Sequence, residues 1–298
     1  MVVRSFLTPV IVVVLGGLCG FFLFKGKQPV SQEPVPEESS PLAGLSAIAL
    51  GENGRLYLGG DFGVRVMDST GEEISHWKTS EKVSSLAVDS TGQIYVASYR
   101  KVEKLAPDGT SLLVWGRGGC SGDDFTLVTG LAVDGKDVFV ADAGVGVVYH
   151  FTGDGEPLNE IDGNETAGEK SGFLIPSPYF DCSVKDGVVY VNNPGHFRIE
   201  KYDFEGNRLG QWGRGGMKKE QFPGCCNPTN LAVFSDGRVV TSQKGGACIK
   251  VFDAQGSFLQ QFGEDIFGDD ARGIDLAVDA RGRIFAVDPG AHCVRVFE

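Results

Sequence analysis

The chain has 298 residues, of which 43 are glycine, and its formal net charge is −12 at pH 7. A length of this order is sufficient to bury a sizeable core. Surfaces that bind nucleic acid need clustered Lys and Arg side chains, and no dense basic run follows Lys27, so the sequence excludes nucleic acid as a partner. The glycines are spread between short apolar runs, which indicates many tight turns and predicts an all-β protein.

Residues 1–27 differ in kind from the rest of the chain. Ser5 to Phe24 is a run of twenty residues without a charged side chain, bounded by Arg4 and Lys25. A helix of about 20 residues spans about 30 Å, the thickness of the hydrocarbon core of a bilayer. The run is longer than the apolar part of a cleaved signal peptide and lacks its small-residue exit. We therefore predict one N-terminal transmembrane helix that acts as a signal anchor, with the rest of the chain on the extracytoplasmic (periplasmic) side.

A spacer and one folded domain are expected to follow this anchor. Residues 28–42 are rich in Pro, Glu and Ser, a composition typical of a solvated, semi-extended linker. From residue 43 to residue 298 one pattern recurs six times: a first apolar strand such as SSLAVD at 84–89, a second strand, a third strand, a turn glycine and a fourth strand. The central residues of the six first strands are Ile48, Leu86, Leu131, Cys182, Leu231 and Leu276.

These central residues lie about 40–50 residues apart, a period that is typical of propeller blades when the repeat contains only strands. The sequence therefore predicts a six-bladed β-propeller of four-stranded blades over residues 43–298. Trp77, Trp115 and Trp212 all fall at the end of a fourth strand, where large aromatic side chains are expected to anchor one blade on the next. The sixth unit stops after its third strand, and because an unpaired edge invites aggregation, we expect residues just before Leu45 to close the ring.

The repeat resembles that of the NHL family. The resemblance rests on the LAVD-type first strand, on second strands such as DVFVAD at 137–142, and on third strands such as RIEKYD at 198–203 and CIKVFD at 248–253, each followed by two residues and then a glycine. It covers nearly all of residues 43–298. NHL-like propellers include protein-binding, RNA-binding and lyase members, and similar six-bladed rings include metal-dependent lactonases, so the fold does not choose a function.

One face of the predicted propeller collects the cysteines. Strands alternate in direction within a blade, so loops 4–1 and loops 2–3 open on the same face. Cys225 and Cys226 lie in the loop 4–1 that enters blade 5, and Cys248 and Cys293 begin third strands directly after loops 2–3, at the position of Arg198 in blade 4. Cys120, His196 and His292 map to the same face, whereas Cys182 occupies a core position.

Three interpretations of these cysteines stay open. An exported domain is oxidised, so Cys225 or Cys226 could form a disulfide with Cys248 or Cys293. Thiolates and imidazoles also bind zinc or iron, so a zinc or iron–sulfur site could be built from Cys225, Cys226, Cys248, Cys293 and His292. In the third interpretation they are unrelated buried thiols.

A second constellation is expected near the axis of the ring. Asp181, Asn230 and Asp275 directly precede the central first-strand residues of blades 4, 5 and 6. Three oxygen-bearing side chains at equivalent inner positions could bind calcium or another hard cation, or simply line a water-filled channel. They resemble the channel ligands of lactonase-type propellers, although Ala47 stands where those enzymes carry a glutamate of the first blade.

The leading functional hypothesis is a membrane-tethered, non-catalytic propeller that binds a protein partner or small ligand on the loop 4–1/2–3 face near blades 4 to 6. The first alternative is a metal- or redox-linked function of the cysteine cluster. The second alternative is a metal-dependent lyase or lactonase centred on Asp181, Asn230 and Asp275.

Overall fold

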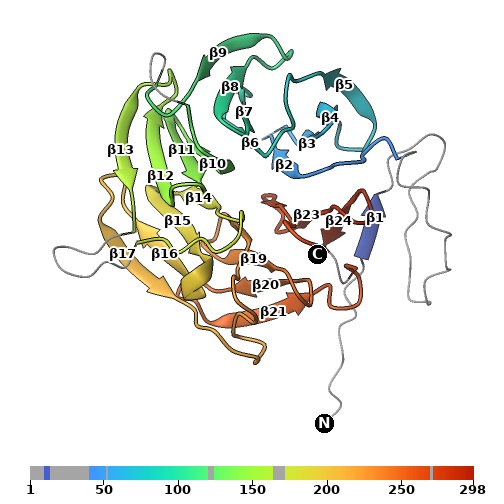
Figure 1. The fold of residues 1–298 in the computed structure, drawn as a ribbon. Helices are drawn as coiled ribbons and strands as arrows, with labels where there is room; N and C mark the ends of the chain where they lie inside the picture. The colour runs from blue at the N-terminus through green and yellow to red at the C-terminus, as the bar shows by residue number, and fades with distance from the viewer. Residues whose placement is uncertain (1–9, 14–39, 52, 120–123, 164–171, 269–270) are drawn as a thin grey trace.

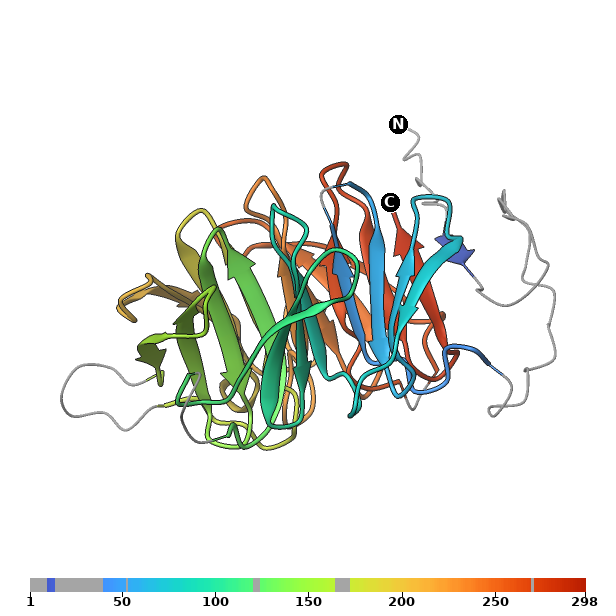
Figure 2. The ribbon, with the colours of Figure 1, turned by 90° about the horizontal axis from the view of Figure 1, so that it is seen from above.

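The computed structural model describes residues 10–13, 40–51, 53–119, 124–163, 172–268 and 271–298. These residues form six four-stranded antiparallel sheets that stand side by side around a central axis (Figure 1). Seen at 90° to that view, the strands run between two loop-covered ends of a disc (Figure 2). The protein is therefore an all-β, six-bladed propeller, and this part of the sequence prediction is confirmed.

The strands follow the repeat in chain order. Blades 1 to 3 contain β2 (Ala47–Leu50), β3 (Leu56–Gly60), β4 (Gly63–Met67), β5 (Glu73–Trp77), β6 (Ser85–Val88), β7 (Ile94–Ser98), β8 (Lys101–Leu105), β9 (Ser111–Trp115), β10 (Val128–Asp134), β11 (Asp137–Asp142), β12 (Val147–Thr152) and β13 (Pro157–Ile161). Blades 4 and 5 contain β14 (Cys182–Lys185), β15 (Val188–Asn193), β16 (Arg198–Tyr202), β17 (Arg208–Trp212), β18 (Asn230–Val233), β19 (Val239–Gln243), β20 (Cys248–Phe252) and β21 (Phe258–Phe262), with a short 3-10 turn η2 (Pro194–His196) in blade 4. Blade 6 contains β22 (Leu276–Val278), β23 (Ile284–Asp288), β24 (Cys293–Phe297) and β1 (Val10–Val13).

The apolar core lies between neighbouring blades. The second strands are almost fully buried, as in β7, β19 and β23, because a blade covers each of their faces and their β-branched and aromatic residues fit such a two-sided environment. The fourth strands lie at the outer rim, where β17 exposes alternate side chains and β9 exposes Ser111, Leu112 and Val114.

The tryptophans anchor successive blades, as the repeat position predicts. Trp212 ends β17 of blade 4 and lies against the turn glycine between the third and fourth strands of blade 5, where a Cβ on Gly256 would be 2.3 Å from Cγ of Trp212. Trp77 lies in the same way against Gly109 of blade 2, with a corresponding distance of 2.5 Å. Gly256 also has a φ of 86°, so both its backbone and its contact with the indole require glycine.

The ring is closed by a different segment from the one expected. The fourth strand of blade 6 is β1, which pairs antiparallel with β24 so that Val10 faces Phe297 and Val13 faces Val294. The prediction that residues just before Leu45 provide this strand is wrong. Leu42 and Leu45 instead bury their side chains in the apolar cluster between blades 1 and 6.

The predicted N-terminal helix lies outside the described residues apart from Val10–Val13, which form a strand. The predicted linker at 28–42 is likewise outside them up to residue 39. No helix in the described part of the chain is both long enough and apolar enough to cross a membrane.

Candidate functional site

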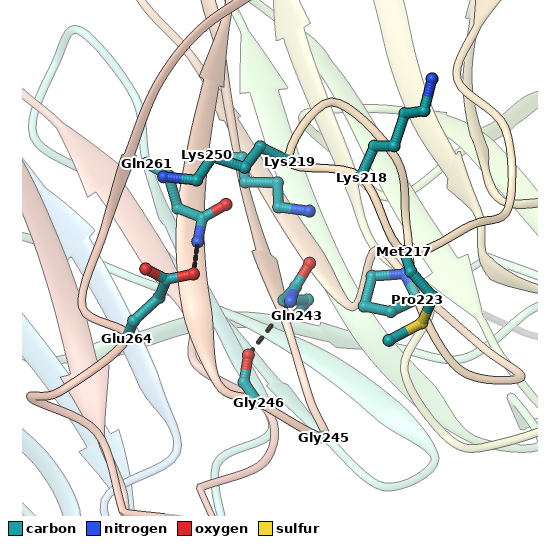
Figure 3. Close-up of a pocket in the computed structure, with 10 residues that line it drawn as sticks. All are labelled: Met217, Lys218, Lys219, Pro223, Gln243, Gly245, Gly246, Lys250, Gln261 and Glu264. Carbon is teal, nitrogen blue, oxygen red and sulfur yellow. Dashed lines mark hydrogen bonds between the residues drawn. The ribbon is translucent and has the colours of Figure 1, made fainter.

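A cavity of about 340 Å³ opens on the loop 4–1/2–3 face at blade 5 (Figure 3). Three loops build it: the 213–229 connection from β17 to β18, the 244–247 turn between β19 and β20, and the segment that follows β21. Its lining residues are Met217, Lys218, Lys219, Pro223, Gln243, Gly245, Gly246, Lys250, Gln261 and Glu264. The cavity therefore lies in the blade 4 to 6 region where the repeat predicted a binding face.

The lining of this cavity is positively charged although the chain is acidic overall. Lys218 and Lys219 are exposed at the rim, and Figure 3 shows Lys218 pointing away from the other lining residues. Lys250 is only 3% exposed. The carboxylate of Glu264 accepts a hydrogen bond from Gln261. Within the described residues, none of the three lysines has a carboxylate within 4.0 Å, so the ammonium groups of the two exposed lysines, Lys218 and Lys219, are accessible to a ligand.

The floor of the cavity holds two buried polar side chains. Lys250 donates a hydrogen bond to the carbonyl of Gln221 and lies 5.7 Å from the centre of the Phe222 ring. Burial lowers the pKa of Lys250. The amide nitrogen of Gln243 donates to the carbonyl of Gly246 at 3.0 Å, whereas its buried Oε1 has no hydrogen-bond partner among the described residues. An unsatisfied buried acceptor is costly, so Gln243 presents an oxygen that a ligand donor could satisfy.

The segment that borders the cavity carries two adjacent cysteines. Cys225 is exposed and Cys226 is 2% exposed, and their sulfur atoms are 3.1 Å apart. Burial opposes the ionisation of Cys226, but hydrogen bonds from Lys244, Ser177 and Cys225 and the charge of Lys244 together leave its pKa below the ordinary value. The hydrogen bond to Cys226 raises the pKa of Cys225. The pair is therefore arranged to hold its negative charge on Cys226.

Cys248 and Cys293 occupy equivalent positions in blades 5 and 6, as the repeat predicts. Each begins a third strand, like Arg198 in blade 4. Both are buried, and burial raises the pKa of Cys248 to about 12 and that of Cys293 to about 11. His292 precedes Cys293 with a φ of 51°. The burial and the raised pKa of Cys248 and Cys293 are typical of packed, unreactive thiols.

The structure does not gather these residues into one metal-binding cluster. Within the described residues, no three His, Cys, Asp or Glu side chains are close enough to hold one ion. The five described cysteines are free thiols: Cys182, Cys225, Cys226, Cys248 and Cys293. Of the candidate ligands, Cys225 and Cys226 are brought into contact with each other. Cys120 lies outside the described residues.

The structure brings together the side chains of Asp181, Asn230 and Asp275. The two carboxylates also form hydrogen bonds with the first strand of the next blade. Asp181 accepts hydrogen bonds from the backbone N–H of Cys182 in its own blade at 2.9 Å and of Leu231 in blade 5 at 3.0 Å. Asp275 of blade 6 accepts one from Ile48 of blade 1 at 2.8 Å. A carboxylate at this repeat position thus ties one first strand to the next.

Asn230 lies between the two carboxylates in blade order. Its amide nitrogen is 3.5 Å from Oδ1 of Asp275, and its buried Oδ1 has no hydrogen-bond partner among the described residues. Burial, together with the negative charge of Asp275, raises the pKa of Asp181 well above its usual range. Burial raises the pKa of Asp275 to about 7. Ionising both Asp181 and Asp275 is therefore unfavourable unless a bound cation compensates the two negative charges.

Sequence reasoning missed the lysine-lined cavity. The signals present were Lys218-Lys219 in a loop 4–1 and Lys244-Gly245-Gly246 in the loop 2–3 of the same blade. Each is unremarkable alone, and only the ring geometry brings them together. Gln243 and Lys250 lie in strands, where a polar residue is normally expected to face solvent. The repeat pattern therefore gave no indication that these two side chains are buried.

Comparison with solved structures supports the fold. The chain is similar to a streptogramin B lyase (TM-score 0.58, 17% identity, 86% of this chain and 80% of the other). It is also similar to XC5397, a gluconolactonase of Xanthomonas campestris (TM-score 0.60, 17% identity, 86% of each chain), and to the computationally designed protein Ika8 (TM-score 0.50, 19% identity, 85% and 70%). No protein-family model matches the sequence, so the NHL resemblance stays a prediction. At these identities the likeness establishes the β-propeller alone.

Proposed function

We propose that this protein is a ligand-binding propeller and that the cavity at blade 5 binds a small anionic ligand, one that carries carboxylate or phosphate groups. The observation that carries this proposal is that three lysines, Lys218, Lys219 and Lys250, line one cavity with a single carboxylate, that of Glu264, in a chain of net charge −12. Ammonium groups form strong charge-assisted hydrogen bonds with such anions.

The shape and position of the cavity support the same proposal. A concave site with a few convergent polar groups is the usual form of a small-molecule site, and Gln243 adds an unpaired oxygen that can accept a hydrogen bond from the ligand. The repeat motifs support an NHL-type binding scaffold. Val10–Val13 of the apolar run Ser5–Phe24 form β1 of blade 6, so this run cannot span a membrane as one helix while it closes the ring.

The test is calorimetric titration of the full-length protein with citrate and with inorganic phosphate. We expect saturable binding of at least one of these anions, weakened about tenfold or more in Lys219→Glu, because one charge-assisted hydrogen bond contributes about 1.5–3 kcal/mol. Lys136→Glu is the matched control, since Lys136 is an exposed lysine in the turn between β10 and β11 and should leave binding unchanged. Failure of the wild-type protein to bind either anion, or equal binding by Lys219→Glu, would contradict the proposal.

A second candidate function is favoured by the orphaned Oδ1 of Asn230. Two carboxylates and an amide oxygen are the ligand types that calcium prefers, so the channel residues fit a hard cation and would support the lyase or lactonase alternative. Both carboxylates already accept backbone hydrogen bonds, and Ala47 supplies no oxygen from blade 1.

Calcium is therefore expected to raise the melting temperature of the wild-type protein at pH 8 and to have much less effect at pH 5, where the carboxyl groups are protonated. Thermal denaturation with and without calcium measures this. The variant Asp275→Asn should lose the calcium response, whereas Asp203→Asn, in an exposed turn between β16 and β17, should keep it. A melting temperature independent of calcium at both pH values would leave the water-filled channel as the interpretation.

A further inference from the structure

The adjacent cysteines beside the cavity are held in a defined arrangement. The side chain of Asn227 donates hydrogen bonds to the carbonyls of Pro223 and Lys244 at 2.7 and 3.0 Å, and it accepts one from the backbone N–H of Lys244 at 3.0 Å. The 223–227 segment is therefore fixed to the turn after β19. Cys225 and Cys226 lie within that fixed segment, so their 3.1 Å sulfur contact follows from the fold of the loop.

A positive charge is positioned next to the buried sulfur. The ammonium group of Lys244 donates to the hydroxyl of Ser177 at 2.9 Å and lies 4.9 Å from the centre of the Tyr179 ring. Both Lys244 and Ser177 lower the pKa of the neighbouring Cys226 thiol. Ser177 and Tyr179 precede blade 4, whereas Lys244 belongs to blade 5, so the environment of Cys226 is assembled from two blades.

The two thiols have complementary properties. Cys225 is exposed and can be reached from solvent, whereas Cys226 is buried beside Lys244. A thiolate is the reactive form of cysteine, and a neighbouring cation stabilises it. Cys182, Cys248 and Cys293 are buried, and burial raises the pKa of each. Within the described residues, reactivity is therefore confined to the Cys225–Cys226 pair.

We propose that Cys225 and Cys226 form a thiol–disulfide exchange site that reduces small disulfides bearing carboxylate groups and becomes a disulfide between the two adjacent residues. The carboxylate preference is argued from Lys244 beside Cys226 and from the nearby rim lysines Lys218 and Lys219. The proposal stands whether or not the cavity itself binds an anion.

The exchange is balanced in two steps. In the first, the Cys225 thiol passes its proton to the Cys226 thiolate, and the Cys225 sulfur attacks one sulfur of the small disulfide, whose S–S bond breaks to release one thiolate. In the second, Cys226 gives its proton to that thiolate and attacks the Cys225 sulfur, which breaks the mixed disulfide and releases the second thiolate. Two electrons pass from the cysteine pair to the small disulfide, which leaves as one thiol and one thiolate, and the thiolate takes up a proton from water.

The experiment uses the reduced full-length protein with Cys19→Ser and Cys120→Ser, which removes the two cysteines outside the described residues. It treats this protein, and every variant in the same background, with oxidised glutathione, an anionic disulfide, and measures the released thiol and the mass of tryptic peptide 220–238. This peptide contains both cysteines and no other. We expect two equivalents of glutathione per chain and a peptide that has lost two hydrogens. Cys226→Ser should release one equivalent and retain a bound glutathione, and Cys225→Ser should release almost none on the same timescale. Cys293→Ser is the control and should behave as wild type.

Two further measurements separate the parts of the proposal. Lys244→Met should slow the release of the second equivalent about tenfold, since the thiolate fraction of Cys226 falls with the loss of the neighbouring charge. Cystamine, a cationic disulfide, should react more slowly than oxidised glutathione. A wild-type protein that stops at a stable mixed disulfide would overturn the exchange proposal without any variant. Equal rates for the two disulfides would overturn the carboxylate preference.

Discussion

Replacing Glu200 with alanine is expected to lower the free energy of unfolding by about 3–5 kcal/mol, the usual loss when one partner of a buried ionic network is removed. Glu200 lies in the third strand of blade 4 and is 0% exposed. Its carboxylate accepts hydrogen bonds from Arg198 at 2.6 Å, from Asn193 at 2.8 Å and from the hydroxyl of Tyr202. Removing the carboxylate leaves a guanidinium, an amide and a phenol without their acceptor in the blade.

Chemical denaturation of the full-length protein measures this loss. Glu205→Ala, which removes an exposed glutamate from the turn after the same strand, should change stability by less than about 0.5 kcal/mol. Glu200→Gln should fall between the two, because the amide oxygen can replace one acceptor but its NH₂ group faces donors. A Glu200→Ala variant as stable as the Glu205→Ala variant would show that the network contributes little.

The second large effect is a fall in stability as the pH rises from about 4 to about 7. The pKa of Asp275 is raised from 3.8 to about 7 in the folded protein, and that of Asp181 is raised well above its usual range, in both cases mainly through burial. The folded state therefore keeps protons in this window that the unfolded chain has lost. Stability is greatest below the unfolded pKa and is lost as the pH rises through the folded pKa, by about 1.4 kcal/mol per pH unit for each proton retained.

Denaturation curves at several pH values without divalent cations measure this fall, which we expect to total a few kcal/mol. Asp275→Asn cannot ionise, so its profile should be flatter over the same window. Asp203→Asn should keep the wild-type slope, because hydrogen bonds from Asn207 lower the pKa of Asp203 and its titration falls below the window. A wild-type stability that rises between pH 4 and 7 would mean that the channel carboxylates are ionised in the folded protein.

The sequence allowed the architecture to be predicted because the propeller is a repeat. Aligning the six units placed the three tryptophans at one position, and the structure sets Trp77 and Trp212 against the turn glycines of the next blades. The same alignment placed Asp181, Asn230 and Asp275 at equivalent inner positions, which meet near the axis because every first strand lies there.

The cysteine face could not be predicted to the same depth. A repeat position tells how far along a blade a residue lies, but each blade is rotated relative to its neighbour. Cys248 and Cys293 therefore share a position yet bury their side chains separately. Cys225 and Cys226 lie in a loop 4–1, whose length differs between units, so their contacts with Lys244 and Ser177 depend on non-repeating residues. The closing strand β1 was missed because an apolar run carries the same signal for a helix or a strand.

The hydrogen bond between Asp275 and Ile48 joins residues 227 positions apart, and it has a consequence for how the chain folds. Contacts between neighbouring blades are local in sequence and can form while the chain lengthens, but the contact between blades 6 and 1 requires both ends of the domain. Closing so long a loop is entropically costly, and such non-local pairing is slow. Until the last blade is complete, the apolar flanks of blades 1 and 5 have no partner, so the nascent protein passes through an open arc that is prone to aggregation.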